Sequence, residues 1–94
     1  MIRDEFEWDD EKDMVNQVKH DVSFDEASRA FEDPNRVIVR DKTHSTRYEE
    51  RLFCIGEIER GIVTVRYTQR GERIRIFGAG FWRQGRRIYE ENNG

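Results

Sequence analysis

Hydrophobic and polar residues alternate through most of the second half of the chain, with the period of two that β-strands require. The strands that this pattern predicts are residues 36–40, about 50–58, 62–69 and 73–79. The dipeptides Arg60-Gly61 and Arg70-Gly71 are expected to form hairpin turns, because glycine readily adopts the positive φ that tight turns need. The polar residues 41–49 predict a loop between the first two of these strands.

The beginning of the chain carries a short alternating segment followed by a helix signal. Residues 2–8 predict a strand. Asp9 is suited to cap a helix that runs to about His20, because the acidic residues after it favour the positive end of the helix dipole. The apolar residues expected on the inner face of this helix are Met14, Val15 and Val18.

A second helix is predicted after a capping box. Ser23 is followed three residues later by Glu26, which is the pattern that satisfies the first free N–H groups of a helix. Pro34 ends this helix soon after Asp33. Residues 82–91 predict a short helix at the end of the chain. The pattern as a whole predicts an α+β domain, with two N-terminal helices packed on an antiparallel sheet and a short C-terminal helix.

The two predicted turns also fix a register between the strands. Tyr67 would face Ile74 and Cys54, and Arg66 would face Arg75. Further pairs on the same reasoning are Val65 with Ile76 and Ile58 with Val63. The face expected to receive the helices carries Cys54, Ile58, Val63, Val65, Tyr67, Ile74 and Ile76. The opposite face carries Arg66, Arg73 and Arg75 beside Thr64 and Thr68.

Neighbouring arginines repel one another unless an anion lies between them. The expected pair of Arg66 and Arg75 therefore needs either a carboxylate of the protein, for which Glu57 is a candidate, or a bound phosphate. Acidic and basic residues are also unevenly distributed along the chain. Residues 1–33 contain twelve acids and four bases, whereas residues 60–87 contain eight arginines and one acid, Glu72. This division suits either pairing of the two halves or an anion-binding face.

Composition limits the class of protein. A chain of 94 residues is expected to form one domain, residues 1–94, and 39% of its residues are charged. No apolar run is long enough to span a bilayer, and the acidic start lacks the features of a signal peptide. The single cysteine, Cys54, excludes an internal disulfide and a cysteine-based zinc site. We therefore expect a cytoplasmic protein without a cofactor.

Several motifs, in order along nearly the whole chain, resemble those of the BrnT toxins, formerly the DUF497 family. The motifs are Phe6-Glu7-Trp8-Asp9 with Lys12, Asn16 and Lys19-His20, then Val22, Phe24, Ala27 and Phe31-Glu32-Asp33-Pro34, then His44-Ser45 and Glu49-Glu50-Arg51, and finally Tyr67-Thr68-Gln69-Arg70 and Ile74-Arg75-Ile76. One block departs from the common form. Many members read Ser-Ala-Arg where this chain has Gly78-Ala79-Gly80, so the usual arginine is absent, and Arg83 is a candidate replacement.

The resemblance implies a RelE-like ribonuclease fold and toxicity through RNA cleavage and arrest of translation. It also implies a BrnA-like antitoxin, a ribbon-helix-helix protein that neutralises the toxin, with operator DNA bound only through the complex of the two. No membrane is implied as a partner.

Metal-independent RNA cleavage needs a base, an acid and cations that stabilise charge on the phosphate. The catalytic candidates are His20, Glu50, Arg51, Arg66, Arg75 and Arg83. The candidates for RNA binding are Lys19, His44, Tyr67, Arg73 and Trp82. Structural roles compete with these: His20 is suited to stabilise a helix end, His44 to a solvated loop, and Glu50 and Arg51 to an ion pair.

Two functional hypotheses follow from these observations. The first is a ribonuclease toxin, which accounts for the motifs and the arginines. The second is a homologue without catalysis that acts as a co-repressor together with its antitoxin, and the variant block at Gly78-Ala79-Gly80 motivates it. A protein that binds DNA by itself is disfavoured by the net charge of −3 and by the lack of a helix-turn-helix pattern.

Overall fold

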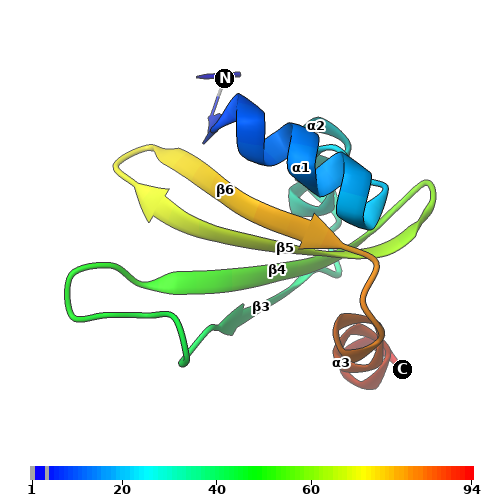
Figure 1. Ribbon diagram of the computed structural model, residues 1–94. Coiled ribbons are helices and arrows are strands. Elements are labelled where there is room, and N and C mark those ends of the chain that lie inside the picture. Colours follow the sequence, from blue (N-terminus) through cyan, green and yellow to red (C-terminus); the bar gives the residue numbers. More distant parts are fainter. Residues whose placement is uncertain (1, 4) are drawn as a thin grey trace.

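The computed structural model describes the backbone of residues 2, 3 and 5–94 and the side chains of residues 5–94. Within this part of the chain, six strands form one sheet in the order β1-β2-β6-β5-β4-β3 (Figure 1). The strands are β1 (Ile2–Arg3), β2 (Phe6–Trp8), β3 (Val37–Arg40), β4 (Arg51–Ile58), β5 (Gly61–Arg70) and β6 (Arg73–Gly80). The helical elements are α1 (Asp10–His20), α2 (Phe24–Ala27), the 3₁₀ helix η1 (Ser28–Glu32) and α3 (Arg83–Asn93).

The α+β class agrees with the sequence, but the expected arrangement of two N-terminal helices on an antiparallel sheet is wrong. β2 runs parallel to β6, with Phe6 opposite Ile74 and Trp8 opposite Ile76, so the sheet is mixed. The second predicted helix is a single α-turn, α2, that tightens into η1. The helices also do not share one side of the sheet. α2 packs on the core face through Phe24 and Ala27, and α3 packs on the opposite face, here called the second face, at Thr64. α1 lies along the edge formed by β6 (Figure 1).

The predicted inner face of α1 is also wrong. Met14 and Val18 are 67% and 87% exposed, and the buried residue of the helix is Asn16. The Asn16 side-chain amide donates to the carbonyl oxygens of Val22 (3.0 Å) and Ala79 (2.9 Å), and its oxygen accepts from the Ala79 N–H (3.2 Å). These bonds attach α1 to the edge of β6 beyond the end of β2. The helix therefore meets the sheet through a polar residue at its edge and not through an apolar stripe on its face.

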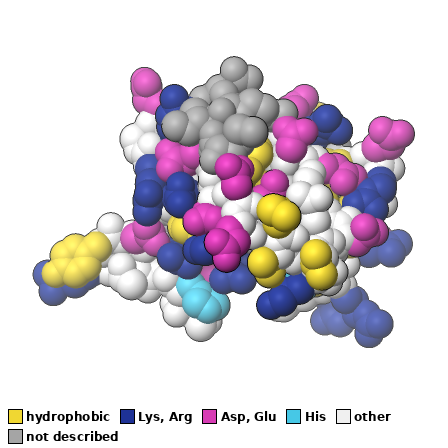
Figure 2. All heavy atoms as spheres, turned by 45° about the horizontal axis from the view of Figure 1, so that its top comes forward, with side chains coloured by type: hydrophobic (Ala, Val, Ile, Leu, Met, Phe, Trp, Pro, Cys, Tyr) yellow, Lys and Arg dark blue, Asp and Glu magenta, His cyan; other side chains and the backbone are white. Residues whose placement is uncertain are grey.

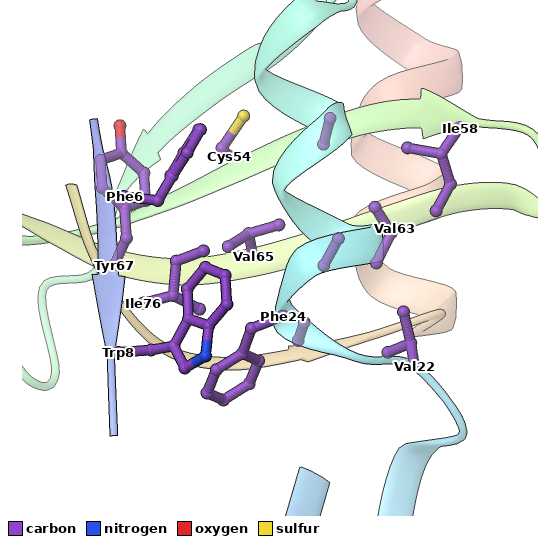
Figure 3. Packing of buried hydrophobic residues seen from close by; sticks show 13 residues of the cluster. Phe6, Trp8, Val22, Phe24, Cys54, Ile58, Val63, Val65, Tyr67 and Ile76 are labelled. Carbon is purple, nitrogen blue, oxygen red and sulfur yellow. The ribbon is translucent and has the colours of Figure 1, made fainter. Parts of the chain in front are cut away.

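The predicted core face of the sheet is confirmed. The residues of that face in the buried cluster are Cys54, Ile58, Val63, Val65, Tyr67 and Ile76, and Ile74 packs against it. Figure 3 shows Trp8, Phe24 and Ile76 pointing toward one another at the centre of this core. The Trp8 and Phe24 rings meet edge to face at 6.1 Å, a geometry that aromatic pairs favour.

The predicted hairpin register is wrong by two residues. Cys54 faces Val65, and the loop between β4 and β5 is residues 59–60. Between β5 and β6 the loop is residues 71–72, with Gly71 at φ 59° in its first position, as type II′ turns require. A register shift between Arg66 and Tyr67 then moves Arg66 opposite Gly78, so Arg66 does not face Arg75. Because the slip is an even number of residues, the two faces of the sheet keep their predicted members.

The helix α3 packs closely on the second face of the sheet. A Cβ atom at Gly85 would overlap with the Thr64 hydroxyl, which is buried and has no hydrogen-bond partner among the described residues. Near the other end of α3, the Tyr89 hydroxyl donates to the Asp33 carboxylate at 2.6 Å. Burial opposes ionisation of Asp33, but this bond and backbone N–H donors outweigh it and lower the pKa of Asp33. In the described part of the chain, no helix has the length and apolar character needed to cross a membrane.

Candidate functional site

A hollow of about 450 Å³ lies between α1 and the second face of the sheet. We call it the α1 hollow. Its lining from α1 and the cap before it is Asp9, Glu11, Lys12, Val15, Asn16, Lys19 and His20. The sheet and the segment after it contribute Arg66, Phe77, Gly78 and Trp82.

Arg66 is the cation that β5 contributes to this hollow. Its side chain lies across Gly78, since a Cβ atom there would be 3.7 Å from the Arg66 Cδ and 3.8 Å from its Nη1. Within residues 5–94, no carboxylate lies within ion-pair distance of the Arg66 guanidinium. A half-buried guanidinium without an acidic partner is suited to bind an anion from outside.

The last turn of α1 brings two more cationic candidates to the hollow. Lys19 and His20 are exposed there, and the helix ends at Asp21 in the left-handed conformation (φ 56°). The His20 ring stands edge-on to the Trp82 indole at 5.3 Å. His20 therefore lies at a helix end, where positive charge is favoured, and also lines the hollow.

Trp82 lies where the variant block leaves space. A Cβ atom at Gly80 would overlap with the Trp82 indole, so the ring packs directly on the backbone of Gly80. Arg83, the sequence-based candidate to replace the arginine missing at Gly80, is exposed and does not line the α1 hollow; it lines another hollow together with Arg60 and Arg86. Among the described residues, Arg66 is the arginine that lines the α1 hollow.

A second hollow, of about 520 Å³, lies beside the first. We call it the loop hollow. Its lining is Val39, Arg40, Asp41, Lys42, Thr43, His44, Phe53, Ile55, Thr64, Trp82, Gln84, Gly85 and Ile88. Trp82 lines both hollows, and Arg66 of the first is paired across the strands with Phe53 of the second. The two hollows therefore adjoin on the same face of the sheet, and we call them together the groove.

His44 is held in the loop hollow by a buried carboxylate. Its Nδ1 lies 2.8 Å from the Asp41 Oδ2, while the Asp41 Oδ1 accepts from the N–H groups of Thr43 and His44, both at 3.2 Å. The Asp41 side chain is 6% exposed and that of His44 is 52% exposed. Burial opposes ionisation of Asp41, but the hydrogen bonds from His44 and the backbone outweigh it and lower the pKa of Asp41.

Three of the predicted catalytic residues lie in ion pairs within the protein. Glu50 pairs with Arg40 at 3.2 Å, Arg51 with Glu49 at 2.9 Å, and Arg75 with Glu7 at 2.9 Å. The partner of Arg75 is thus Glu7 and not the proposed Glu57. Arg51 also stacks on the Phe77 ring at 4.0 Å, so it borders the α1 hollow without lining it.

The predicted RNA-binding residues are divided between the groove and other places. Lys19, His44 and Trp82 line the groove. Tyr67 is in the core, where burial raises its pKa to about 12, and Arg73 begins β6 opposite Arg70, away from both hollows. The groove thus contains Lys19, His44 and Trp82, whereas Tyr67 lies in the core and Arg73 in the β5–β6 hairpin.

Sequence reasoning missed Lys12 and Asp41, two of the charged residues that line the groove. Lys12 lies seven residues before Lys19, a spacing that puts both on one side of a helix, and its Nζ is 5.8 Å from the Phe77 ring centroid. Asp41 lies three residues before His44, within reach of a side-chain bond in a turn. These two spacings were the signals available in the sequence.

Acidic and basic side chains are interleaved over the surface. Figure 2 shows Lys and Arg side chains beside Asp and Glu side chains across the face turned forward. Several arginines near the sheet pair with acids, whereas Arg66 has no carboxylate within ion-pair distance among residues 5–94. No group of three or more His, Cys, Asp or Glu side chains suited to a metal ion occurs among residues for which side chains are described.

A known protein family matches most of the chain. The model of a family described as the ribonuclease toxin, BrnT, of type II toxin–antitoxin systems matches residues 8–84. The chain belongs to the BrnT family. The resemblance of its motifs to BrnT toxins is thereby confirmed. No curated protein matches the chain. The family consists of ribonuclease toxins of type II toxin–antitoxin systems, so an antitoxin is the partner that membership implies.

The match to BrnT covers the whole lining of the α1 hollow and that of the loop hollow as far as Gln84. It includes all of α1, the 41–50 loop and the sheet from β3 to β6. It also includes the variant block, in which the Trp82 ring occupies the space beside Gly80.

Proposed function

We propose that this BrnT-family chain is an endoribonuclease that cleaves RNA in the groove without a metal ion and arrests translation in the cytoplasm. The observation that carries the proposal is the guanidinium of Arg66, which has no carboxylate partner among the described residues and lies in a hollow with Lys12, Lys19 and His20. Family membership supplies the substrate class, since BrnT toxins are ribonucleases.

The groove supplies the groups that an RNA strand needs. The Arg66 guanidinium can grip a phosphodiester with two parallel hydrogen bonds. The α1 wall carries Lys12 and Lys19 beside Asp9 and Glu11. Arg66 gives the lining an excess of positive charge, which attracts the backbone regardless of base sequence. The half-buried indole of Trp82 offers a surface on which an unpaired base can stack.

The chemistry proposed is attack by a ribose 2′-hydroxyl on the neighbouring phosphorus, which yields a 2′,3′-cyclic phosphate and a 5′-hydroxyl. Arg66 stabilises the charge that builds on the phosphate oxygens. The imidazole of His20 is a candidate for proton transfer on the α1 side of the groove.

The partner proposed is a BrnA-like ribbon-helix-helix antitoxin, which blocks the toxin and brings the complex to operator DNA. Family membership supports an antitoxin, and the resemblance of the motifs supports the BrnA type. Co-expression with such a protein should give a stable complex on size exclusion and should abolish growth arrest. A toxin that remains active in the presence of excess BrnA-like protein would contradict this part of the proposal.

Cleavage of RNA by the purified protein tests the central part of the proposal. A structured RNA incubated with the protein and excess EDTA should be cut, with 2′,3′-cyclic phosphate ends. Arg66→Gln should lower kcat by on the order of 10²-fold or more, as removal of a transition-state donor does. Arg29→Gln is the matched control, because it removes one exposed arginine from η1 on the other side of the sheet.

Equal cleavage by wild type and the Arg66 variant would overturn the assignment of the site. Addition of the wild type to a cell-free translation reaction should also stop synthesis and degrade mRNA. Synthesis that stops while the mRNA stays intact would contradict RNA cleavage as the cause.

The second candidate is a co-repressor without catalysis. The observation in its favour is the Trp82 indole that fills the space beside Gly80, the position at which the resemblance to BrnT motifs leads us to expect an arginine. This candidate predicts a tight complex with the antitoxin and the operator, together with no RNA cleavage at any protein concentration.

A further inference from the structure

We propose that His44, oriented by Asp41, is the general base of the RNA cleavage reaction. The inference rests on the proposed ribonuclease function and assigns a role that the RNA-binding interpretation of His44 does not include. The supporting observation is in the loop hollow, where the half-exposed imidazole of His44 is hydrogen-bonded to the buried carboxylate of Asp41.

The geometry of this pair fixes the ring. Asp41 is itself held by its backbone, since its N–H donates to the Arg51 carbonyl oxygen at 2.8 Å. Its Oδ1 accepts the N–H groups of Thr43 and His44, which leaves Oδ2 for the ring at 2.8 Å. A carboxylate bonded to Nδ1 selects the tautomer with its proton on Nδ1. The Nε2 atom then carries a lone pair on the side of the ring away from Asp41.

The charges around His44 suit a proton acceptor that works beside a phosphate. Of the residues that line the loop hollow, the charged ones are Arg40, Asp41 and Lys42. The residues facing it from β4 and α3, including Phe53, Gln84 and Ile88, are uncharged. Asp41 stabilises the imidazolium that forms when the ring accepts a proton. Arg40 is already paired with Glu50 at 3.2 Å, which leaves Lys42 to attract the RNA backbone.

The position of His44 relative to Arg66 supports one shared substrate. Trp82 lines both hollows, and Arg66 is paired with Phe53, which lines the loop hollow. An RNA strand that crosses this face would contact Arg66 and the loop of His44 in succession. The structure thus offers a phosphate-binding group and an oriented base on the same side of the sheet.

The reaction balances without a further reactant. The Nε2 atom of His44 takes the proton of the 2′-hydroxyl while the 2′-oxygen forms a bond to phosphorus. The bond from phosphorus to the 5′-oxygen breaks, and this oxygen takes a proton from solvent. His44 then returns its proton to solvent, and the products are the cyclic phosphate and the free 5′-hydroxyl.

The test compares wild type with His44→Gln, Asp41→Asn and the double variant, on a short RNA that contains one cleavable linkage. His44→Gln should lower kcat by about 10²–10⁴-fold, the range for loss of a general base. Asp41→Asn should lower kcat at least about tenfold, since the amide favours the wrong tautomer. It should lower it no further in the His44→Gln background, because the two residues act as a unit.

Three readouts separate catalysis from a structural role. A 2′-O-methyl oligonucleotide, which cannot react, should bind wild type and His44→Gln with equal affinity. For wild type, kcat/KM should decline at acid pH as the base takes up a proton, and this decline should be absent in His44→Gln. Added imidazole should restore cleavage by His44→Ala in proportion to its concentration. Tyr48→Ala, an exposed change in the same loop, is the control and should cleave normally.

The results that would overturn the proposal are distinct from those that would overturn the function. Cleavage by His44→Gln within about threefold of wild type, or a His44→Ala variant that imidazole does not rescue, removes the role of His44 and leaves the ribonuclease standing. A wild type that cuts no RNA overturns both. Thermal unfolding of each variant identifies a misfolded one, and in that case the rescue of His44→Ala decides.

Discussion

Replacement of Asn16 by alanine tests how the helix α1 is held to the sheet. Asn16 is 6% exposed and is the buried residue of α1. It makes three hydrogen bonds, two with Ala79 of β6 and one with Val22. The same helix carries Lys12, Lys19 and His20 into the α1 hollow, so its position affects the proposed site directly.

The expected loss follows from these bonds. A hydrogen bond in a protein contributes about 1 kcal/mol net, and a buried group left without a partner costs about 1–3 kcal/mol. Three bonds therefore give about 3 kcal/mol. Alanine is the better helix former by about 0.5 kcal/mol, which offsets part of the loss. We expect Asn16→Ala to lower the free energy of unfolding by about 2–3 kcal/mol.

Urea unfolding followed by tryptophan fluorescence measures this difference. Gln17→Ala is the matched control, because Gln17 is the next residue of α1 and is exposed. The control should change the free energy of unfolding by less than about 0.5 kcal/mol. A loss below about 1 kcal/mol for Asn16→Ala, or equal losses for the two variants, would refute the view that this amide attaches α1 to β6.

Three further predictions concern the rest of the fold. Gly85→Ala should lower the free energy of unfolding by about 1–3 kcal/mol in urea titrations, because its Cβ would overlap with the Thr64 hydroxyl; an unchanged midpoint would contradict the contact. Tyr89→Phe should cost about 1.5–3 kcal/mol at pH 7, since it removes a bond to the Asp33 carboxylate. The pKa of Asp33 is lowered in the folded state, so its contribution is present above about pH 4 and lost as pH falls through the folded pKa; a penalty for Tyr89→Phe equally large at pH 2 would contradict this. Burial raises the pKa of Cys54 to about 12, so a thiol reagent at pH 8 should label the unfolded protein and leave the folded protein unmodified.

The core of the sheet was predictable because strand periodicity depends only on local sequence. A side chain in a strand points to one face or the other, so alternation alone assigned Val63, Val65 and Ile76 to the core. The exact pairs were not predictable, because they depend on which residues occupy each turn. Gly71 opens its loop, and a register shift follows at Arg66. Such local irregularities leave no pattern in the alternation.

The position of α1 could not be predicted from the sequence pattern for a different reason. An apolar stripe predicts an inner face only when a helix lies on a sheet, whereas α1 lies at the edge of β6 and buries Asn16. The parallel pairing of β2 with β6 joins residues far apart in the chain, and no local signal specifies it.

Residue chemistry selected individual candidates for the site, but it did not show which of them lie together. His20, Arg66 and Trp82 were chosen for their chemistry, and they line one hollow. Arg75 was chosen on the same grounds and is paired with Glu7, because the parallel strand β2 brings that carboxylate beside it. Tertiary pairing decides whether a given arginine has an acidic partner.

The two tryptophans provide the most direct test of the central claim, that RNA binds along the groove. Trp8 is buried in the core under α2, whereas Trp82 lines both hollows. Titration of the ¹⁵N-labelled protein with a 2′-O-methyl oligonucleotide should shift the indole N–H signal of Trp82 and leave that of Trp8 in place, and Arg66→Gln should weaken the response. A Trp82 signal that stays unchanged while the oligonucleotide binds would show that RNA lies elsewhere on the protein.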